Sequence, residues 1–235
     1  MEKKKNDFIA QGSILAIASI LVRVMGMIYR IPMTAIIGDK GNGFYSYAYS
    51  VYTILLLLSS YSLPLAVSKM VSAKAQLGQW RNVKRVFICA IAFAIGIGTT
   101  FGLIVLIGAQ FFTRVFFHSE LAAIALRFMA PTILIMALLG VFRGFFQGLQ
   151  NTLPTAVSQI VEGLINAIMS VVFAYFLFDF GHGMDAASGT TDLGYAWGAA
   201  GGAIGTGAGA LAGLIFCFIL FVAYRKILAV NISRD

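Results

Sequence analysis

The feature that most constrains the fold of this 235-residue chain is a series of six long apolar runs separated by short polar or charged segments. An α-helix needs about 20 mostly apolar residues to cross the hydrocarbon core of a bilayer, and each run reaches that length. The runs are continuous, whereas strands of a membrane β-barrel alternate polar and apolar residues over about ten positions. The sequence therefore predicts an all-α, polytopic membrane protein, with about six transmembrane helices in a single lobe. We place these helices at approximately residues 8–37, 44–68, 86–112, 121–142, 155–178 and 195–224.

The composition excludes the ordinary soluble classes of protein. Sixty per cent of the residues are hydrophobic and 11% are charged, whereas a soluble domain usually has about 25% charged residues. The net charge of +8 would suit a nucleic-acid-binding protein, but the basic residues stand in short clusters between the apolar runs. The loops of a membrane protein place them in this way. We therefore expect a lipid bilayer around the chain and no nucleic-acid partner.

The distribution of Lys and Arg predicts the orientation of the chain, because cytoplasmic loops of membrane proteins are enriched in these residues. If the N-terminus is cytoplasmic, only Lys40 and Arg114 fall on the outer side. We expect a multi-pass protein of a cell's inner or plasma membrane, with both termini cytoplasmic and outer loops at 38–43, 113–120 and 179–194. The basic N-terminus lacks a convincing cleavage site, so we expect an uncleaved first helix. The inner side then collects Lys3, Lys4, Lys5, Lys69, Lys74, Arg81, Lys84, Arg85, Arg143, Arg225, Lys226 and Arg234.

Arginines inside the apolar runs are candidate substrate contacts, because one Arg at a helix centre costs about 2.5–3.5 kcal/mol to insert. Arg23 and Arg30 are seven residues apart, which places them within about 20° of one helix face and about 10 Å apart along the axis. Guanidinium groups bind phosphate oxygens in a bidentate manner, so the pair is suited to a pyrophosphate. Alternatively, each arginine snorkels or pairs with Glu162 or a backbone carbonyl. Arg127, near the outer end of the fourth run, is a third candidate.

A second set of polar residues stands where the fourth run ends and the fifth begins. Glu162 is the only acidic residue well inside an apolar run. It could take up a proton or a cation during transport, or it could be a static partner for an arginine or for Gln159 and Asn166 on neighbouring turns. With Gln159 and Arg143, it forms a set of polar residues with a coupling or a structural role.

No constellation of an enzyme, a cofactor site or a metal site is present. The sequence has no nucleophile-elbow, Walker or zinc-protease motif. Cys89 and Cys217 lie inside apolar runs and belong to no ligand cluster, so they are expected to pack. We expect a non-enzymatic protein without cofactor or metal, in which any transport is passive or driven by an ion gradient or the membrane potential.

Regularly spaced glycines in the sixth run and clustered tyrosines in the second run predict two further helix surfaces. Glycines spaced by four in the sixth run predict a close helix–helix contact, since small residues let backbones approach in lipid. Tyrosines at the outer end of the second run form either an interfacial aromatic belt or a sugar-stacking surface at a cavity mouth. The glycines are Gly201, Gly205, Gly209 and Gly213, and the tyrosines are Tyr45, Tyr47, Tyr49 and Tyr52.

Several segments resemble one family. They are LVRVMGMIYR at 21–30, the polar loop at 38–43, SLPLAVSK at 62–69, FRGFFQGLQ at 142–150 and PTAVSQIVE at 154–162. They are similar to sporulation stage V protein B-like and lipid II flippase-like proteins of the multidrug/oligosaccharidyl-lipid/polysaccharide exporter superfamily. The resemblance implies two six-helix lobes around a central cavity, lipid-linked sugar substrates and alternating access. It also implies that the arginines of the first helix meet the pyrophosphate of the substrate.

Three functions follow as hypotheses. The first is a flippase, or the N-terminal half of one, for polyprenyl-pyrophosphate-linked sugars or a peptidoglycan precursor. The second is a multidrug-type cation antiporter of the same superfamily, which should line its cavity with acidic residues. The third is a truncated membrane scaffold that transports nothing. Because six helices supply one wall of a two-lobe cavity, we expect a second six-helix lobe or a second copy of this chain as partner.

Overall fold

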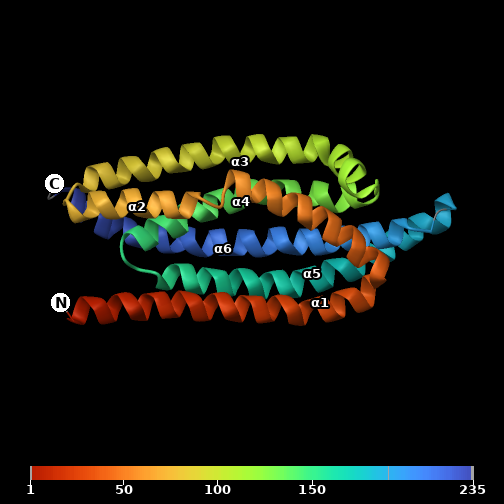
Figure 1. Ribbon diagram of the computed structural model, residues 1–235, viewed down its shortest axis with the longest axis horizontal. Coiled ribbons are helices and arrows are strands. Elements are labelled where there is room, and N and C mark those ends of the chain that lie inside the picture. Colours follow the sequence, from red (N-terminus) through yellow and green to blue (C-terminus); the bar gives the residue numbers. More distant parts are fainter. Residues whose placement is uncertain (1, 190, 234–235) are drawn as a thin grey trace.

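The computed structural model describes the backbone of residues 2–189 and 191–233, and the side chains of these residues except 2–11 and 188. Every regular element in this described part is an α-helix, which confirms the all-α prediction. The helices lie lengthwise beside one another, and α1 starts at the end of the molecule where α6 finishes (Figure 1). The elements are α1 (Glu2–Ser59), α2 (Leu63–Gln76), α3 (Trp80–Phe117), α4 (Ala122–Gly148), α5 (Leu153–Ser188) and α6 (Leu193–Ser233).

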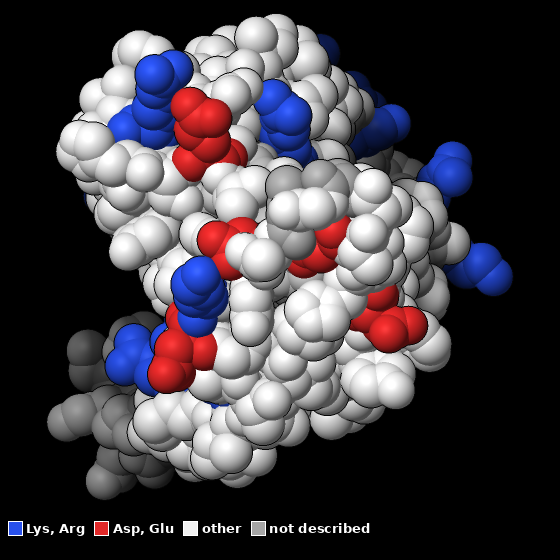
Figure 2. Space-filling view, turned by 90° about the vertical axis from the view of Figure 1, so that its right-hand side faces the viewer, with Lys and Arg blue, Asp and Glu red and all other residues white. Residues whose placement is uncertain are grey.

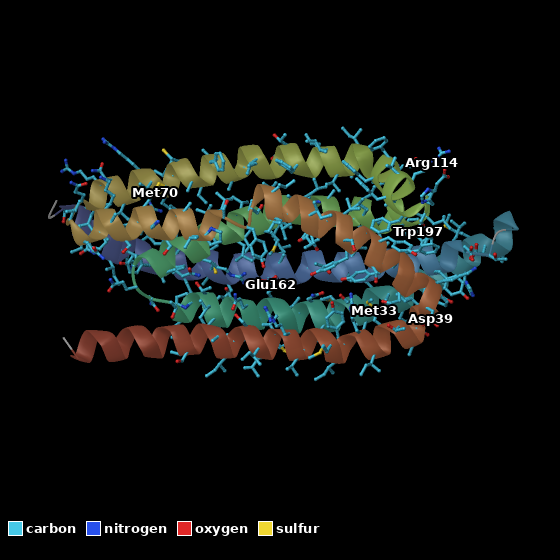
Figure 3. All side chains as sticks on the ribbon, in the orientation of Figure 1. Met33, Asp39, Met70, Arg114, Glu162 and Trp197 are labelled. Carbon is cyan, nitrogen blue, oxygen red and sulfur yellow. The ribbon has the colours of Figure 1, made fainter. Side chains whose placement is uncertain are left out.

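Five helical stretches of the described chain are long and apolar enough to cross a membrane. The first, Gly12–Gln76, has 65 residues, about three times what one crossing needs. It runs along the molecule, bends sharply near Asp39 and returns (Figures 1 and 3). Counted as two crossings, it agrees with the prediction of about six membrane helices.

The predicted outer loop at 38–43 is wrong in extent. Only Gly38 leaves the helical conformation, with φ 63° and ψ −179°, and Asp39–Gly43 are already helical again. This left-handed φ strains residues that carry a Cβ, which explains why a glycine stands at the bend. The bend therefore joins two helical arms, which we call the first arm (residues 2–37) and the second arm (residues 39–59).

Other boundaries also differ from the prediction. The expected helix at 44–68 is interrupted by a turn at Ser60–Ser62, and α2 then begins with a proline in its first turn. Proline has no N–H to donate and is tolerated at a helix start. The helices α3 and α5 continue to Phe117 and Ser188, so the outer connections are shorter than predicted. Polar residues at helix ends were mistaken for loops.

The glycine ladder of α6 lies against α5. A Cβ on Gly201 would collide with the backbone of Phe173 and Ala174, and one on Gly209 would lie 2.6 Å from the carbonyl oxygen of Glu162. Gly205 faces Ser170 just as closely. The two backbones approach so nearly that no side chain fits between them at these positions.

The two ends of the bundle differ in charge. Figure 2 views the end where α1 bends, and Asp and Glu side chains gather there among a few basic ones. Two ion pairs lie at that end, Lys40–Asp192 at 2.9 Å and Arg114–Glu120 at 3.6 Å. Of the twelve basic residues predicted for the opposite side, the side chains of Lys3, Lys4, Lys5 and Arg234 lie outside the described residues.

Candidate functional site

The centre of the candidate site is an ion pair between α4 and α5. The Nη2 of Arg143 lies 2.7 Å from Oε2 of Glu162, and its Nε donates a hydrogen bond of 2.9 Å to Oγ of Ser158. Arg143 is only 9% exposed, and Glu162 lies near the middle of the molecule's length (Figure 3). The predicted end of this helix at residue 142 is therefore wrong, because α4 continues to Gly148 and Arg143 is a buried residue inside it.

The spacing of polar residues on α5 explains why they meet α4. Thr155, Ser158 and Glu162 follow one another at intervals of three and four, which places them on one face of a helix. The Oγ1 of Thr155 donates to the carbonyl of Arg143 at 3.5 Å and accepts from Nε2 of Gln147 at 3.4 Å. The short connection between α4 and α5 brings the start of α5 beside the end of α4, so that these side chains face one another, whereas farther along both helices pack mainly against α6.

A first cavity of about 270 Å³ lies beside this network. We call it the amide cavity, because Gln147 and Gln159 line it together with Arg143. The Oε1 of Gln159 is enclosed and has no hydrogen-bond partner among the described residues. A buried amide oxygen without a hydrogen-bond partner destabilises the folded state. If the side-chain amide of Gln159 flipped, its NH2 group would occupy the position of Oε1. The cavity is lined by Leu56, Ser60, Tyr61, Pro64, Met136, Gly140, Arg143, Gln147, Thr155 and Gln159.

A second cavity, also of about 270 Å³, lies between the two arms of α1 and the helices α5 and α6. We call it the tyrosine cavity, because Tyr29 of the first arm faces Tyr45, Tyr49 and Tyr52 of the second arm across it. The face seen in Figure 2 is hollowed between two bulges of the molecule. The remaining lining residues are Val22, Gly26, Leu56, Met136, Glu162, Gly163, Asn166 and Thr206.

The four tyrosines of the second arm divide between two environments. Tyr45 and Tyr52 are buried, and the hydroxyl of Tyr45 lies 3.3 Å from Oγ1 of Thr206. Tyr49 stacks on Tyr45 with ring centroids 5.8 Å apart. Tyr47 instead stacks on Phe117 at 4.7 Å and lines neither cavity. Three of the four residues thus line the tyrosine cavity, but only Tyr49 exposes its ring, because Tyr45 and Tyr52 belong to the hydrophobic core.

Arg23 and Arg30 flank the tyrosine cavity without lining it. Each follows a residue that lines it, Val22 or Tyr29, so its side chain leaves the helix about 100° from that face. Met25 contacts Gly163 of α5 on the other flank of the helix, and the arginines therefore lie on the side away from α5. Both are exposed.

The charges of these two arginines are not neutralised within the described side chains. Neither Arg23 nor Arg30 forms an ion pair there. The guanidinium carbon of Arg30 lies 5.9 Å from the ring centroid of Tyr45, so this arginine reaches across to the second arm. The alternative that Glu162 pairs with an arginine of the first helix is wrong, since its partner is Arg143.

The structure does not bring Arg127 to this site. It is an exposed residue of α4 that lines neither cavity. Conversely, sequence reasoning missed Tyr29 and Thr206 as cavity residues. Tyr29 stands three residues after Gly26 and one before Arg30, which was an available signal, whereas nothing in the sequence distinguished Thr206 from other small residues of the ladder.

Comparisons with known proteins agree with this architecture. A sequence model of a family described as "Polysaccharide biosynthesis protein" matches residues 8–233. Stage V sporulation protein B of Bacillus subtilis (strain 168) is 26% identical over 228 residues, which are 97% of this chain and 41% of that protein. Lipid II flippase MurJ of the same organism is 27% identical over 163 residues, 66% of this chain and 30% of that protein. An uncharacterized membrane protein, YabM, also of this organism, is 27% identical over 174 residues, 74% of this chain and 32% of that protein.

The family match and the three relatives cover different shares of the sequences compared. This chain spans less than half the length of each of the three relatives. No solved structure matches the chain. The family match, in contrast, covers nearly every residue from the first arm of α1 to the last turn of α6. The chain is a polytopic membrane protein that belongs to the polysaccharide biosynthesis protein family.

Proposed function

We propose that this chain forms one wall of the passage through which a flippase moves a polyprenyl-pyrophosphate-linked sugar or peptidoglycan precursor across the bacterial cell membrane. The observation that carries the proposal is that the acidic residue of the site has an ion-pair partner, whereas the two arginines of the first arm have none among the described side chains. The carboxylate of Glu162 is neutralised by Arg143, whereas Arg23 and Arg30 have no ion-pair partner among the described side chains. The cavity edge is therefore positive and selects an anion.

The neighbouring cavities suit the uncharged part of such a substrate. The amide cavity carries no net charge, because its one charged residue, Arg143, is paired with Glu162. Amide and hydroxyl groups there can donate to and accept from sugar hydroxyls. In the tyrosine cavity, the exposed ring of Tyr49 is a surface on which a sugar can stack. A pyrophosphate held at Arg23 and Arg30 would have both cavities within reach of its head group.

Alternating access requires a second wall. Transporters of this kind move one bundle against another around a site near the middle of the membrane. Arg23 and Arg30 would be costly on a surface that faced lipid alone, so a polar, hydrated cavity on that side would stabilise them. We propose a second six-helix lobe, or a second copy of this chain, as the partner that encloses the site. Cytoplasmic termini complete the proposed arrangement.

A cation antiporter is less well supported by the same geometry. Such a transporter needs an acidic group that is free to bind a proton or an organic cation. Among the described residues, Glu162 is the only acidic one that lines either cavity, and a guanidinium already lies 2.7 Å from it. The positive cavity edge would also repel a cationic drug.

Binding tests the proposal directly. The chain, purified and placed in nanodiscs, is titrated with a fluorescent polyprenyl-pyrophosphate-linked sugar and, separately, with the corresponding polyprenyl alcohol. We expect Arg23→Ala/Arg30→Ala to weaken binding of the pyrophosphate lipid at least about tenfold, since each lost charge-assisted hydrogen bond is worth about 1.5–3 kcal/mol. Lysine at both positions should restore binding only in part, because a point charge replaces a bidentate fork.

The matched control is Arg85→Ala/Arg114→Ala, which removes the same charge from exposed positions outside both cavities. This variant should bind both lipids as the unmodified chain does. Equal affinity of the Arg23→Ala/Arg30→Ala variant and the unmodified chain for the pyrophosphate lipid would disprove the proposed role of the arginines.

A further inference from the structure

A groove of about 420 Å³ lies between the first turns of α3 and the last turns of α6, apart from the two cavities described above. Lys84, Phe87 and Ile88 of α3 form one side of it. Phe221, Arg225 and Ala229 are among the residues of α6 that form the other side. Phe87 and Ile88 stand three and four residues after Lys84, and Phe221, Arg225 and Ala229 are spaced by four, so on each helix these residues share one face.

The groove has an aromatic floor and a basic rim. The rings of Phe87 and Phe221 stack with centroids 4.6 Å apart. The helices α3 and α6 run in opposite directions (Figure 1). Lys84 stands three residues before Phe87 and Arg225 four residues after Phe221, so both lie about one helical turn nearer to the end of the bundle. The two cationic groups are thus at the same height above the floor.

These two charges are free to bind an anion. Lys84 and Arg225 are exposed, and neither forms an ion pair among the described side chains. No acidic residue of the described part of the chain lines the groove. Toward the middle of the bundle the surface continues with the exposed apolar side chains of Ile88 and Val222. A ligand here meets the two cations with apolar side chains on either side of them, Ile88 toward the middle of the bundle and Leu228, Ala229 and Ile232 toward its end.

We propose that this groove is a binding site for an anionic glycerophospholipid of the surrounding membrane. The phosphate lies between Lys84 and Arg225, and an acyl chain lies along Ile88 and Phe221 toward the membrane centre. Charge complementarity supports this occupant, since basic groups at the membrane surface attract anionic lipids and basic pockets between membrane helices bind their head groups. The site is distinct from the substrate cavities and does not depend on the proposed transport function.

Native mass spectrometry of the purified chain tests this site, with phosphatidylglycerol and phosphatidylcholine of identical acyl chains as probes. We expect the unmodified chain to bind one phosphatidylglycerol in preference to phosphatidylcholine. Lys84→Gln/Arg225→Gln should weaken phosphatidylglycerol binding by about 25-fold, or about fivefold for each basic residue. Phosphatidylcholine binding should change little. Ala229→Phe should fill the groove and weaken binding of both lipids, with a melting curve to verify that this variant is folded.

The control is Lys69→Gln/Lys74→Gln on α2, which removes the same charge outside the groove. It should weaken phosphatidylglycerol binding by less than about threefold, as expected for screened surface charge. Equal losses in the two double variants would show that phosphatidylglycerol responds to overall charge, and that result would overturn the site. An unchanged affinity of Lys84→Gln/Arg225→Gln would overturn it as well.

Discussion

At the scale of single residues, Arg143 and Glu162 neutralise each other where α4 and α5 face one another. Their side chains are 11% and 24% exposed, so little water competes for them. Removal of one member of a buried pair leaves the other charge without compensation, which costs more than the pair contributes. The pair therefore links α4 to α5, and the anion-binding role that we propose falls to the unpaired arginines of α1.

This pairing leads to a double-mutant prediction. Arg143→Met and Glu162→Gln should each lower the free energy of unfolding in detergent by about 3 kcal/mol. The double variant should lose clearly less than the sum of the two. Denaturant titration followed by circular dichroism measures all four proteins. Additive losses would contradict direct coupling between the two side chains.

The exposed pair of Arg114 and Glu120 provides the control for that cycle. Its atoms are 3.6 Å apart, and its side chains are 72% and 57% exposed. The corresponding Arg114→Met and Glu120→Gln variants should change the free energy of unfolding by less than about 1 kcal/mol, as is usual for surface ion pairs.

At the scale of the elements, the contact between α5 and α6 depends on missing side chains. Gly201, Gly205 and Gly209 allow one backbone to lie on the other, and the hydroxyl of Ser170 lies 3.2 Å from the carbonyl oxygen of Gly202. In a bilayer, lipid tails are as apolar as the side chains, so the hydrophobic effect does not drive the helices together. The close packing of the two backbones supplies the association energy instead. The α5–α6 unit is therefore a rigid support for Glu162 and for the far wall of the tyrosine cavity.

Gly205→Leu should separate these two helices. The added side chain has no room beside Ser170, so we expect a loss of at least about 3 kcal/mol, above the usual range for overpacking by a few methylenes. The readout is the melting temperature in detergent. Gly96→Leu on α3 is the control, because a Cβ there meets nothing within 4 Å. If the two variants have the same melting temperature, the ladder does not determine the stability of the bundle.

At the scale of the whole molecule, the ends of the bundle carry opposite kinds of surface. Described acidic side chains gather at the end where α1 bends (Figure 2), and clusters of basic residues flank the helices at the other end. Because cytoplasmic segments are enriched in Lys and Arg, we expect the bend of α1 to lie outside the cell and the start of α1 and the end of α6 to lie inside.

Cysteine labelling in intact cells tests this orientation. With Cys89 and Cys217 replaced by serine, a cysteine at the exposed position Glu120 should react with an impermeant thiol reagent from outside. A cysteine at the exposed position Lys69 should react only after the membrane is opened. Labelling of position 69 in intact cells would reverse the assignment of the two sides.

The sequence predicted the helices well, because a run of apolar residues long enough for a bilayer has few other solutions. It predicted their ends poorly. Asp39–Gly43 and Arg143 were placed outside helices on polarity alone, although helices extend past the apolar core and can bury a paired charge. The pairing of Arg143 with Glu162 depends on which faces of α4 and α5 meet. The spacing of residues along one helix does not show which neighbouring helix a face contacts.

The amide cavity and the tyrosine cavity are separated by side chains that belong to both. Leu56 and Met136 line both cavities, so these two apolar side chains are the shared boundary between the amide groups and the tyrosine rings. Methionine has three rotatable side-chain bonds and adapts to irregular spaces. A change of rotamer at Met136 would therefore reshape both cavities at once. Occupancy of the space beside the tyrosines is in this way coupled to the shape of the space beside the amides.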